Sequence, residues 1–505
     1  MELPLTPLDF LARARRLFPE REGIVQDGDR WTYEELAARC DRLAHVLQGE
    51  VAVQPGDVVA WLCSNTHELL EAYYGVLLAG AVLLPLNIRL APAELRAILA
   101  DSQARVLFRH PDQMDPGHPV RTIVLGDGYE ALLAAQPGGP AITPPVDERS
   151  PAELFYTSGS TGSPKGALLS HRGLYLHAVH SALTMGLTGE DVILHTIPLF
   201  HVNGWGTPHF LTGLGGVHVL LPRFDAAEVL RLIEAHRVTR LFLVPAMARL
   251  LLDHPSASER DLSSVRQVSV GGAPASPALL TELEAALDCE CICGYGMTES
   301  SPTLTRSLPK PGQPSTPEQR ATTGIPILGT DVRVLGDGDV EVPWDGVSVG
   351  EICARSNHVM IGYLRAPSAT DAVLRDGWLR TGDLAVVDAD GYLTIVDRAK
   401  DLIVSGGENI ASVEVEHAIE THPAVREAAV VGVSDERWGE VPRAFVSLVP
   451  GESVDEAALI AWVRDRLAPF KTPRSVVFLD ELPKGGTGKI QKQVLRARTG
   501  GSSPS

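Results

Sequence analysis

The stretch YTSGSTGSPKG, residues 156–166, is the most informative part of this chain. It follows the apolar residues Leu154 and Phe155 and contains five Ser or Thr residues, three Gly residues and Lys165, so we expect a turn after a strand. Glycine lets backbone N–H groups approach an anion closely, and hydroxyl and ammonium groups add donors and positive charge. The stretch therefore predicts a phosphate-binding loop. It is not a GxxxxGK[ST] loop, which has Lys directly after its second Gly, and a solvated linker is the alternative.

The length of 505 residues predicts two or more domains, because one hydrophobic core seldom serves so long a chain. Hydrophobic residues make up 44% and charged residues 21%, which is ordinary for a globular protein. The net charge of −19 disfavours a nucleic-acid partner, whose phosphates would be repelled over most of the surface. Anionic ligands must therefore be held by local donors.

Apolar runs of strand length alternate with helical patterns in the N-terminal part of the chain. Residues 225–238 space their apolar side chains at intervals of three and four, as a helix does. The runs that predict strands are residues 57–64, 104–110, 121–127, 218–222 and 240–245. Repeated strand, helix, strand order predicts the α/β class, with a large N-terminal body of β-sheets covered by helices.

The pattern changes from about residue 325, where short β segments predict a small β-rich subdomain. Its last part, residues 384–398, has an Ala-Asp-Gly turn typical of a hairpin. Beyond Lys400 we expect a small α+β lid domain. Its helices are predicted at 413–421 and 455–467, and its strands at 428–433, 443–448 and 475–479. The predicted domains are residues 1–398 and 399–505, with a disordered tail from about residue 499.

The N-terminal twenty residues predict an amphipathic helix and not a signal peptide, because a basic segment followed by an unbroken apolar core is missing. No run approaches eighteen apolar residues, so we expect no transmembrane segment and a cytoplasmic protein. Three of the six cysteines, Cys289, Cys291 and Cys293, could suggest a metal site. Their period of two places them on one face of a strand, whereas zinc sites use CxxC turns, so we expect a buried apolar strand.

Further motifs follow the loop in a set order. They are PLFHVNGW (198–205), GGAP (271–274), GYGMTES (294–300), TGD (381–383), GYLTIVDRAKDLIVSGGENI (391–410) and PKGGTGKI (483–490). With this set the chain resembles the adenylate-forming superfamily, which includes acyl-CoA synthetases, luciferases and the adenylation domains of peptide synthetases. The resemblance implies an ATP-dependent acid–thiol ligase. Such an enzyme forms an acyl-adenylate with release of pyrophosphate, and then transfers the acyl group to CoA to give acyl-CoA and AMP.

The resemblance implies an ATP site and a magnesium ligand. Glu299 resembles the acid that holds Mg²⁺, and Thr298 resembles the hydroxyl that contacts the α-phosphate. The catalytic residues that it implies are Lys489, Thr298, Glu299 and His201. The ATP- and AMP-binding residues are Thr157, Ser158, Gly159, Ser160, Thr161, Gly162, Lys165, Gly271, Gly272, Ala273, Pro274, Gly294, Tyr295, Gly296, Thr298, Asp383 and Arg398. Without the family, Glu299 would be an ordinary helix-start carboxylate and Asp383 a turn residue.

The C-terminal motifs imply a second conformation for transfer to coenzyme A. Lys489 resembles the lysine that bridges the carboxylate and the α-phosphate during adenylation, and Lys400 resembles the hinge about which the lid rotates. The residues implied to bind CoA are Ser405, Gly406, Gly407, Arg437, Trp438, Phe470 and Arg474. Each of these alone would be an ordinary packing or solvated residue.

The segment around His201 predicts the kind of acid. Peptide-synthetase domains normally have an Asp at this position to bind an α-ammonium, and His201 supplies no such anion. His201, Val202, Asn203 and Trp205 are expected to line the acyl pocket, and residues 205–219 contain no Arg or Lys to pair with a second carboxylate. We expect a monocarboxylate with an apolar tail, first a medium- or long-chain fatty acid. The alternatives are an aryl acid, or a stand-alone adenylation enzyme that loads an acyl carrier protein. A homodimer is left open.

Overall fold

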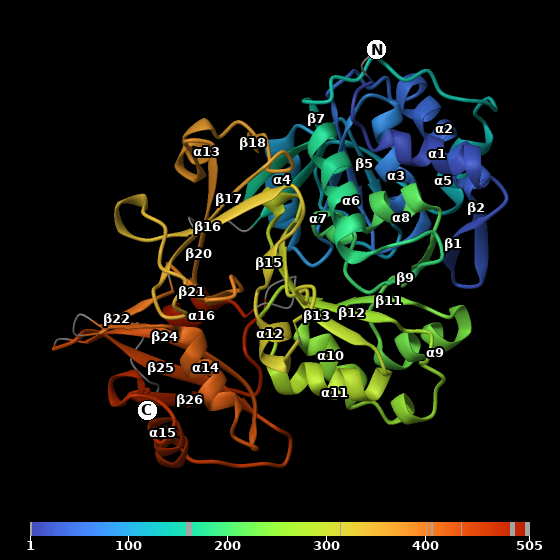
Figure 1. The fold of residues 1–505 in the computed structure, drawn as a ribbon. Coiled ribbons are helices and arrows are strands. Elements are labelled where there is room, and N and C mark those ends of the chain that lie inside the picture. The colour runs from blue at the N-terminus through green and yellow to red at the C-terminus, as the bar shows by residue number, and fades with distance from the viewer. Residues whose placement is uncertain are drawn as a thin grey trace. The chain divides into compact units, whose positions relative to one another are not determined.

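The computed structural model describes residues 3–157, 164–313, 315–399, 401–405, 408–435, 437–484 and 490–499 (Figure 1). The chain divides into two compact units. The first is Met1–Val332 with Ala354–Leu379, and the second is Arg333–Cys353 with Arg380–Ser505. This division follows compactness, and the domain boundary expected between residues 398 and 399 stays a prediction. Within the described residues, no helix is long and apolar enough to cross a membrane.

A seven-stranded sheet forms one part of the first unit, in the order β18-β8-β7-β4-β3-β5-β6. Its strands are β3 (Val58–Leu62), β4 (Val82–Pro85), β5 (Val106–Arg109), β6 (Arg121–Val124), β7 (Pro151–Thr157), β8 (Lys165–Ser170) and β18 (Gly362–Tyr363). Strands β3 to β7 are parallel where they pair, and β8 is antiparallel to β7. The strands predicted at 57–64, 104–110 and 121–127 are confirmed.

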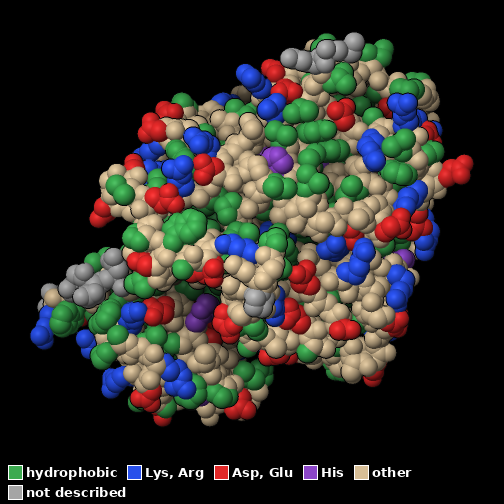
Figure 2. Space-filling view, viewed as in Figure 1, with side chains coloured by type: hydrophobic (Ala, Val, Ile, Leu, Met, Phe, Trp, Pro, Cys, Tyr) green, Lys and Arg blue, Asp and Glu red, His purple; other side chains and the backbone are tan. Residues whose placement is uncertain are grey.

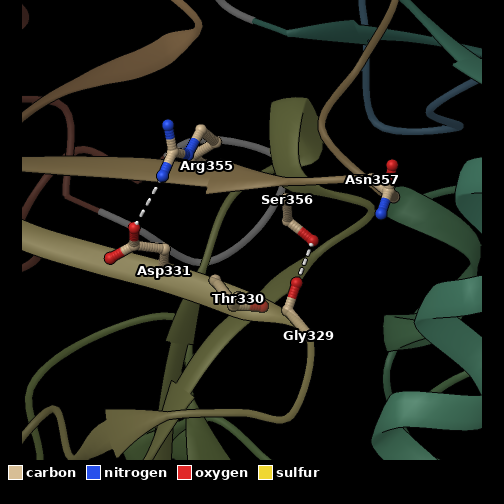
Figure 3. A pocket seen from close by; sticks show the side chains of 6 residues that line it. All are labelled: Gly329, Thr330, Asp331, Arg355, Ser356 and Asn357. Atoms are coloured by element: carbon tan, nitrogen blue, oxygen red, sulfur yellow. Dashed lines mark hydrogen bonds and ion pairs between the residues drawn. The ribbon is translucent and has the colours of Figure 1, made fainter.

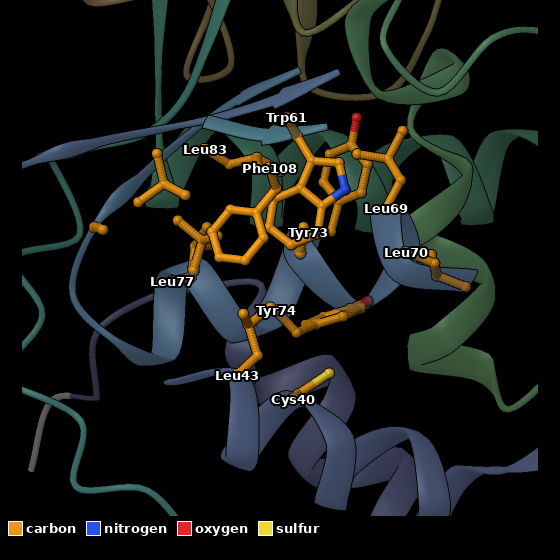
Figure 4. Packing of buried hydrophobic residues seen from close by; sticks show 14 of the residues in the cluster. Cys40, Leu43, Trp61, Leu69, Leu70, Tyr73, Tyr74, Leu77, Leu83 and Phe108 are labelled. Carbon is orange, nitrogen blue, oxygen red and sulfur yellow. The ribbon is translucent and has the colours of Figure 1, made fainter. Parts of the chain in front are cut away.

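Both faces of this sheet are buried. In β3, Val59 and Trp61 pack in one core, while Ala60 and Leu62 pack in another. Figure 4 shows Trp61 and Phe108 of the sheet above α3 (His67–Leu78), which packs in turn on α2 (Tyr33–Gly49). Helix α4 (Pro92–Ser102) contributes to the core on the opposite face. Burial on both faces explains why the sequence of β3 is continuously apolar and does not alternate.

A nine-stranded sheet forms the other part of the first unit, in the order β15-β14-β13-β12-β11-β9-β10-β1-β2. Its strands are β1 (Glu22–Gln26), β2 (Asp29–Thr32), β9 (Val192–His195), β10 (Val217–Leu220), β11 (Arg240–Leu243), β12 (Gln267–Gly271), β13 (Glu290–Gly296), β14 (Thr303–Arg306) and β15 (Ile325–Pro326). From β1 to β13 the pairs are parallel. The predicted helix between β10 and β11 is α9 (Ala226–His236), so this prediction is confirmed.

Helices cover both faces of this sheet as well. Helices α9 and α11 (Pro277–Leu287) share one core with the three cysteines at residues 289, 291 and 293, all of which are free thiols. The buried apolar strand predicted there is confirmed. The opposite face packs against α6 (His171–Met185), α8 (Thr207–Leu214) and α1 (Leu8–Leu17), the expected N-terminal helix. The remaining α-helices of this unit are α5 (Asp127–Ala134), the short α7 (Val202–Trp205), α10 (Pro245–Leu252), α12 (Pro317–Ala321) and α13 (Pro367–Val373).

The β-rich segment and the C-terminal region form two further sheets. The first contains β16 (Thr330–Leu335), β17 (Gly350–Ser356), β19 (Leu374–Arg375), β20 (Trp378–Val387) and β21 (Leu393–Arg398), and β20 and β21 are the expected hairpin. The second contains β22 (Ile403–Ser405), β23 (Glu408–Ile410), β24 (Val425–Asp435), β25 (Gly439–Leu448) and β26 (Ser475–Phe478). Its helices are α14 (Ser412–Glu420), α15 (Glu456–Arg464) and α16 (Lys492–Thr499), so the predicted α+β pattern is confirmed.

Candidate active site

A β-hairpin forms the base of the Gly/Ser/Thr-rich loop. Strands β7 and β8 pair in antiparallel register, with Thr157 opposite Lys165. Both residues are half-buried at the end of the hairpin. The loop positions between them that we predicted to bind phosphate, Ser158 to Gly162, lie outside the residues that the structure describes. The hairpin therefore fixes the two ends of the loop next to each other, and Lys165 lies at one of these ends.

Glu299 lies close to this hairpin although it is distant in sequence. It belongs to the short helix η2 (Thr298–Ser300), and its side chain is only 5% exposed. The Tyr363 hydroxyl donates a 2.7 Å hydrogen bond to Oε1 of Glu299, and Nζ of Lys165 lies 5.4 Å from the centre of the Tyr363 ring. Burial, followed by the charge of Glu299, raises the pKa of Tyr363, so Tyr363 remains a neutral donor. Tyr363 thus lies between the predicted magnesium ligand and the predicted phosphate-binding lysine.

Backbone hydrogen bonds explain this arrangement. The N–H of Met360 donates to the carbonyl of Glu299 at 2.8 Å, and the N–H groups of Ile361 and Leu364 donate to carbonyls of β8. Residues 360–364 therefore connect η2 to the hairpin. Sequence reasoning missed Tyr363, and its only local signal was an aromatic residue after a glycine in the run VMIGYL.

A neutral histidine supports the same turn. His358 is fully buried, and burial lowers its pKa to about 4. Its Nδ1 lies 2.8 Å from the carbonyl of Ser300, which can only accept, so Nδ1 carries the proton. Its Nε2 then accepts from the hydroxyl of Thr330 at 3.0 Å. The ring holds η2 in place without adding a second charge next to Glu299.

The geometry around Glu299 fits a magnesium ion. Within the described part of the chain, Oε1 of Glu299 accepts the Tyr363 hydrogen bond and Oε2 accepts none. A carboxylate with one available oxygen suits Mg²⁺, which binds proteins through one or two carboxylates plus phosphate oxygens and water. No cluster of three or more acidic, His or Cys side chains that could hold a metal by itself occurs among the described residues. The ion would thus need the phosphates of ATP as ligands.

The segment predicted to line the acyl pocket has an unusual backbone. Five consecutive residues have positive φ, from Val202 at 36° to Gly206 at 89°. Positive φ is rare for a β-branched residue such as Val202, so the turn is strained and needs support from its surroundings. Asn203 is fully buried and donates through Nδ2 to Glu153 at 2.9 Å, and Nε2 of His209 donates to the other oxygen of Glu153 at 2.6 Å. A fully buried carboxylate on β7 therefore holds both sides of the turn.

The turn places Trp205 over a row of glycines. A Cβ atom on Gly271 would come within 3.1 Å of the Trp205 ring, and Gly271 is the neighbour of Gly294 in the sheet. The Trp205 ring also meets Phe242 edge to face, with the ring centres 6.2 Å apart. Val202, another residue predicted to line the pocket, packs in the hydrophobic core. Trp205, Phe242 and the glycines therefore lie side by side as an aromatic wall in which the two rings are nearly perpendicular.

The predicted adenine-binding residues lie at the carboxyl ends of adjacent parallel strands. Gly272, Ala273 and Pro274 follow β12 and are exposed, whereas Gly294, Tyr295 and Gly296 at the end of β13 are half-buried. The carboxyl ends of strands in open α/β sheets are the usual place for ligands. Thr298 is buried directly beyond them. The structure thus brings these motifs to one edge of the nine-stranded sheet.

The second unit contains the residues predicted for the ribose and for CoA. Asp383 and Arg398 are opposite each other in β20 and β21, and Nε of Arg398 lies 3.1 Å from Oδ1 of Asp383. Ser405 is buried at the end of β22. The predicted nucleotide-binding side chains Arg437, Trp438, Phe470 and Arg474 are all exposed. The predicted hinge Lys400, the glycines 406 and 407, and the predicted catalytic residue Lys489 lie outside the described residues.

A hollow of about 470 Å³ in the first unit contains none of the predicted residues (Figure 3). It is lined by Gly329, Thr330, Asp331, Arg355, Ser356 and Asn357. Arg355 pairs with Asp331 at 3.1 Å, and the Ser356 hydroxyl donates to the carbonyl of Gly329 at 2.8 Å. The lining is polar and lacks an apolar wall, so it differs from the aromatic wall at Trp205.

The surface charge agrees with local anion binding. On the face shown in Figure 2, Lys and Arg side chains lie among Asp and Glu side chains, and the net charge is −19. Donors such as Lys165 at the hairpin must therefore attract phosphates at short range.

Comparison with known proteins identifies the class of protein. Residues 11–364 match the AMP-binding enzyme family, and residues 414–489 match the AMP-binding enzyme C-terminal domain. The chain is 40% identical to feruloyl-CoA synthase of Amycolatopsis sp over 496 residues, covering 97% of this chain and 98% of the relative. It is 36% identical to the peroxisomal trans-cinnamate:CoA ligase of Petunia hybrida over 536 residues, covering 98% of this chain and 94% of the relative.

Solved structures agree with this assignment. The anthranilate CoA ligase AuaEII in complex with anthranoyl-AMP has a TM-score of 0.90 at 27% identity, covering 99% of this chain and 98% of that chain. ATP-bound MatB from Rhodopseudomonas palustris has a TM-score of 0.88 at 31% identity, covering 97% of this chain and 98% of that chain. The chain therefore belongs to the AMP-binding enzyme family, the adenylate-forming superfamily that its motifs indicated. It is an AMP-forming acyl-CoA synthetase that uses ATP, Mg²⁺ and coenzyme A.

Proposed function

We propose that this acyl-CoA synthetase activates an aromatic monocarboxylic acid of the benzoate or arylpropenoate kind. The observation that carries the proposal is the half-buried Trp205 ring beside Phe242 and the glycine row, because an aromatic side chain next to glycines, which add no side chain of their own, suits contact with a planar ring. The names of the relatives, which include feruloyl-CoA synthase and trans-cinnamate:CoA ligase, support an aryl substrate. They do not favour the medium- or long-chain fatty acid that we expected first, which becomes the second candidate because residues 205–219 are largely Gly, Leu, Thr and Phe and contain no Arg or Lys.

In the first half-reaction, a carboxylate oxygen of the acid attacks the α-phosphorus of ATP and pyrophosphate leaves with the electron pair. Lys165 and the loop from Thr157 to Gly162 bind the β- and γ-phosphates, and Thr298 contacts the α-phosphate. Glu299 would hold Mg²⁺ together with phosphate oxygens, and the ion would neutralise part of the phosphate charge. Tyr363 keeps the Glu299 carboxylate oriented through its hydrogen bond. Lys489 bridges the two reacting anions, and the remaining predicted residues bind the nucleoside, with Tyr295 at the base and Asp383 and Arg398 at the ribose.

In the second half-reaction, the sulfur of CoA attacks the acyl carbon as a thiolate, and AMP leaves with the electron pair. Ser405 and the two glycines that follow it border the pantetheine arm. The exposed side chains of Arg437, Trp438, Phe470 and Arg474 suit stacking and phosphate contact at the CoA nucleotide. Loading of a carrier protein in place of CoA is the alternative for this step.

The test is AMP formation across a panel of acids from acetate to palmitate, with benzoate, cinnamate and coumarate, each with and without CoA. We expect aryl acids to have the highest kcat/KM and AMP turnover to require CoA. A preference for palmitate would refute the aryl assignment, and turnover only with a phosphopantetheinylated carrier would refute CoA as acceptor. Lys489→Ala is expected to lower adenylation about 10²- to 10³-fold, and undiminished ATP–pyrophosphate exchange in this variant would refute its role.

A further inference from the structure

Arg306, the last residue of β14, is a buried cation without a carboxylate partner. Its side chain is 97% buried, since 3% of its surface is exposed, and none of the ion pairs in the described part of the chain includes it. A guanidinium has five N–H donors, yet the described residues accept only one hydrogen bond from it, from Nη1 to the Ser269 hydroxyl at 2.8 Å. Its Nε is buried with no partner. A buried charge with unused donors is costly unless a ligand satisfies it.

The guanidinium lies on the wall of the proposed acid site. Arg306 is opposite Gly294 in the antiparallel pair, and a Cβ atom on Gly294 would lie 4.0 Å from the guanidinium carbon of Arg306. Gly294 is the sheet neighbour of Gly271, which the Trp205 ring covers. The side chains of Arg306 and Trp205 therefore project over adjacent positions of one glycine row.

Phe242 connects the same two side chains. The guanidinium carbon of Arg306 lies 5.9 Å from the centre of the Phe242 ring, and the Trp205 ring meets Phe242 at 6.2 Å. This contact stabilises the cation by attraction to the ring, but a ring face accepts no directional hydrogen bond. Phe242 and Ser269 thus leave most of the Arg306 donors available.

The distance from η2 to Arg306 along strand β14 suits the length of an aryl acid. Strand β14 begins at Thr303, opposite Gly296 and close to the η2 turn that carries Glu299. Arg306 is three residues further along, which corresponds to about 10 Å of strand. An acid whose carboxylate reacts near η2 would extend its ring along this row and bring its far end toward Arg306.

We propose that Arg306 is a specificity-determining residue that binds an oxygen acceptor at the end of the acid opposite to the reacting carboxylate. A second carboxylate would fit best, because it pairs with a guanidinium through two hydrogen bonds, followed by a phenolic or methoxy oxygen. This inference rests on the proposed aryl-acid function and extends it from simple aromatic monocarboxylic acids to aryl acids that carry a second acceptor group, a carboxylate included, at the far end. Residues 205–219 contain no Arg or Lys, and the structure supplies an arginine from a strand about a hundred residues later.

The test compares cinnamate with its 4-carboxy, 4-hydroxy and 4-methoxy derivatives in the wild-type enzyme and in Arg306→Met, which keeps a long unbranched side chain without charge. The readout is the ratio of kcat/KM for each derivative to that for cinnamate, from AMP release in the CoA-dependent reaction. We expect the wild type to favour the derivatives. In Arg306→Met we expect this ratio to fall about 10- to 100-fold, mainly through KM, while cinnamate itself is turned over at least as well as before.

Two variants serve as controls. Arg320→Met removes an arginine whose side chain is 14% exposed and which pairs with Glu284 at 2.8 Å, away from Trp205 and Phe242, and it should leave the ratio unchanged. Arg306→Lys keeps the charge and should retain part of the preference for 4-carboxycinnamate. If Arg306→Met does not fold, a wild type that turns over all four acids equally well overturns the proposal.

The outcomes separate the two proposals. An unchanged ratio in a folded Arg306→Met enzyme that still releases AMP overturns the role of Arg306 alone. Absence of AMP release with every aromatic acid refutes the proposed aryl function.

Discussion

Replacing Tyr363 with Phe tests whether the contact between Tyr363 and Glu299 supports catalysis. The change removes the hydroxyl that donates the 2.7 Å hydrogen bond to Oε1 of Glu299. It keeps the aromatic ring, whose centre lies 5.4 Å from Nζ of Lys165. The variant therefore removes the hydrogen bond that orients the Glu299 carboxylate but keeps the contact between the ring and Lys165. Tyr363→Leu would remove both and is expected to raise the KM for ATP as well.

The magnitude follows from the type of hydrogen bond. A hydrogen bond to a charged group contributes about 1.5–3 kcal/mol, and each 1.36 kcal/mol changes a rate tenfold. Because Tyr363 is half-buried, water can replace part of the lost interaction, so we expect adenylation to fall about 10- to 100-fold. ATP–pyrophosphate exchange measured against Mg²⁺ concentration is the assay, and the variant should need more Mg²⁺ to reach its half-maximal rate.

Tyr129→Phe provides a matched control. The Tyr129 hydroxyl donates a hydrogen bond of the same length, 2.7 Å, to the buried carboxylate of Glu71 in the core between α2 and α3. This control should lower the melting temperature without changing exchange in the folded enzyme. If Tyr363→Phe exchanges within twofold of the wild type at limiting Mg²⁺, or if both variants lose activity equally, the proposed role of Tyr363 is wrong.

Three further predictions concern the metal and two buried carboxylates. Chelation with EDTA should abolish AMP formation and added Mg²⁺ should restore it, and a rate unchanged in EDTA would contradict the magnesium role. Glu153→Leu removes the shared hydrogen-bond acceptor of Asn203 and His209, so it should lower the free energy of unfolding by about 3–5 kcal/mol. It should also raise the KM for the acid more than the KM for ATP. Equal effects on both KM values would contradict the role of Glu153 in positioning the turn. Burial would raise the pKa of Glu71, but the hydrogen bond from His67 lowers this pKa below its ordinary value of 4.5. Burial would lower the pKa of His67, but the same hydrogen bond raises this pKa above its ordinary value of 6.5. The melting temperature of the wild type should therefore exceed that of Glu71→Gln most between about pH 4.5 and 6.5 and less on either side, and a constant difference would contradict this coupling.

The sequence predicted the parts of the site that lie within single motifs. Thr157 and Lys165 flank one loop, and Thr298 and Glu299 follow one strand, so their neighbours in the chain were enough to propose them, and their roles stay predictions. Tyr363, Glu153 and Arg306 were missed because their roles depend on pairing between distant strands. No periodicity in the chain indicates that β18 would pair with β8, or that Arg306 would lie opposite Gly294.

The strained turn at residues 202–206 connects the proposed acid wall to the strand that precedes the predicted phosphate loop. Its backbone is unfavourable by itself, so the buried contacts of Asn203 and His209 with Glu153 must stabilise it. Glu153 lies on β7, four residues before Thr157, where the phosphate loop begins. The same strand therefore positions Trp205 through Glu153 and Lys165 through the hairpin. Because strands within a packed sheet hardly bend, we expect a shift of β7 to move the Trp205 turn and the hairpin together, which would keep the distance between the proposed acid and phosphate sites constant.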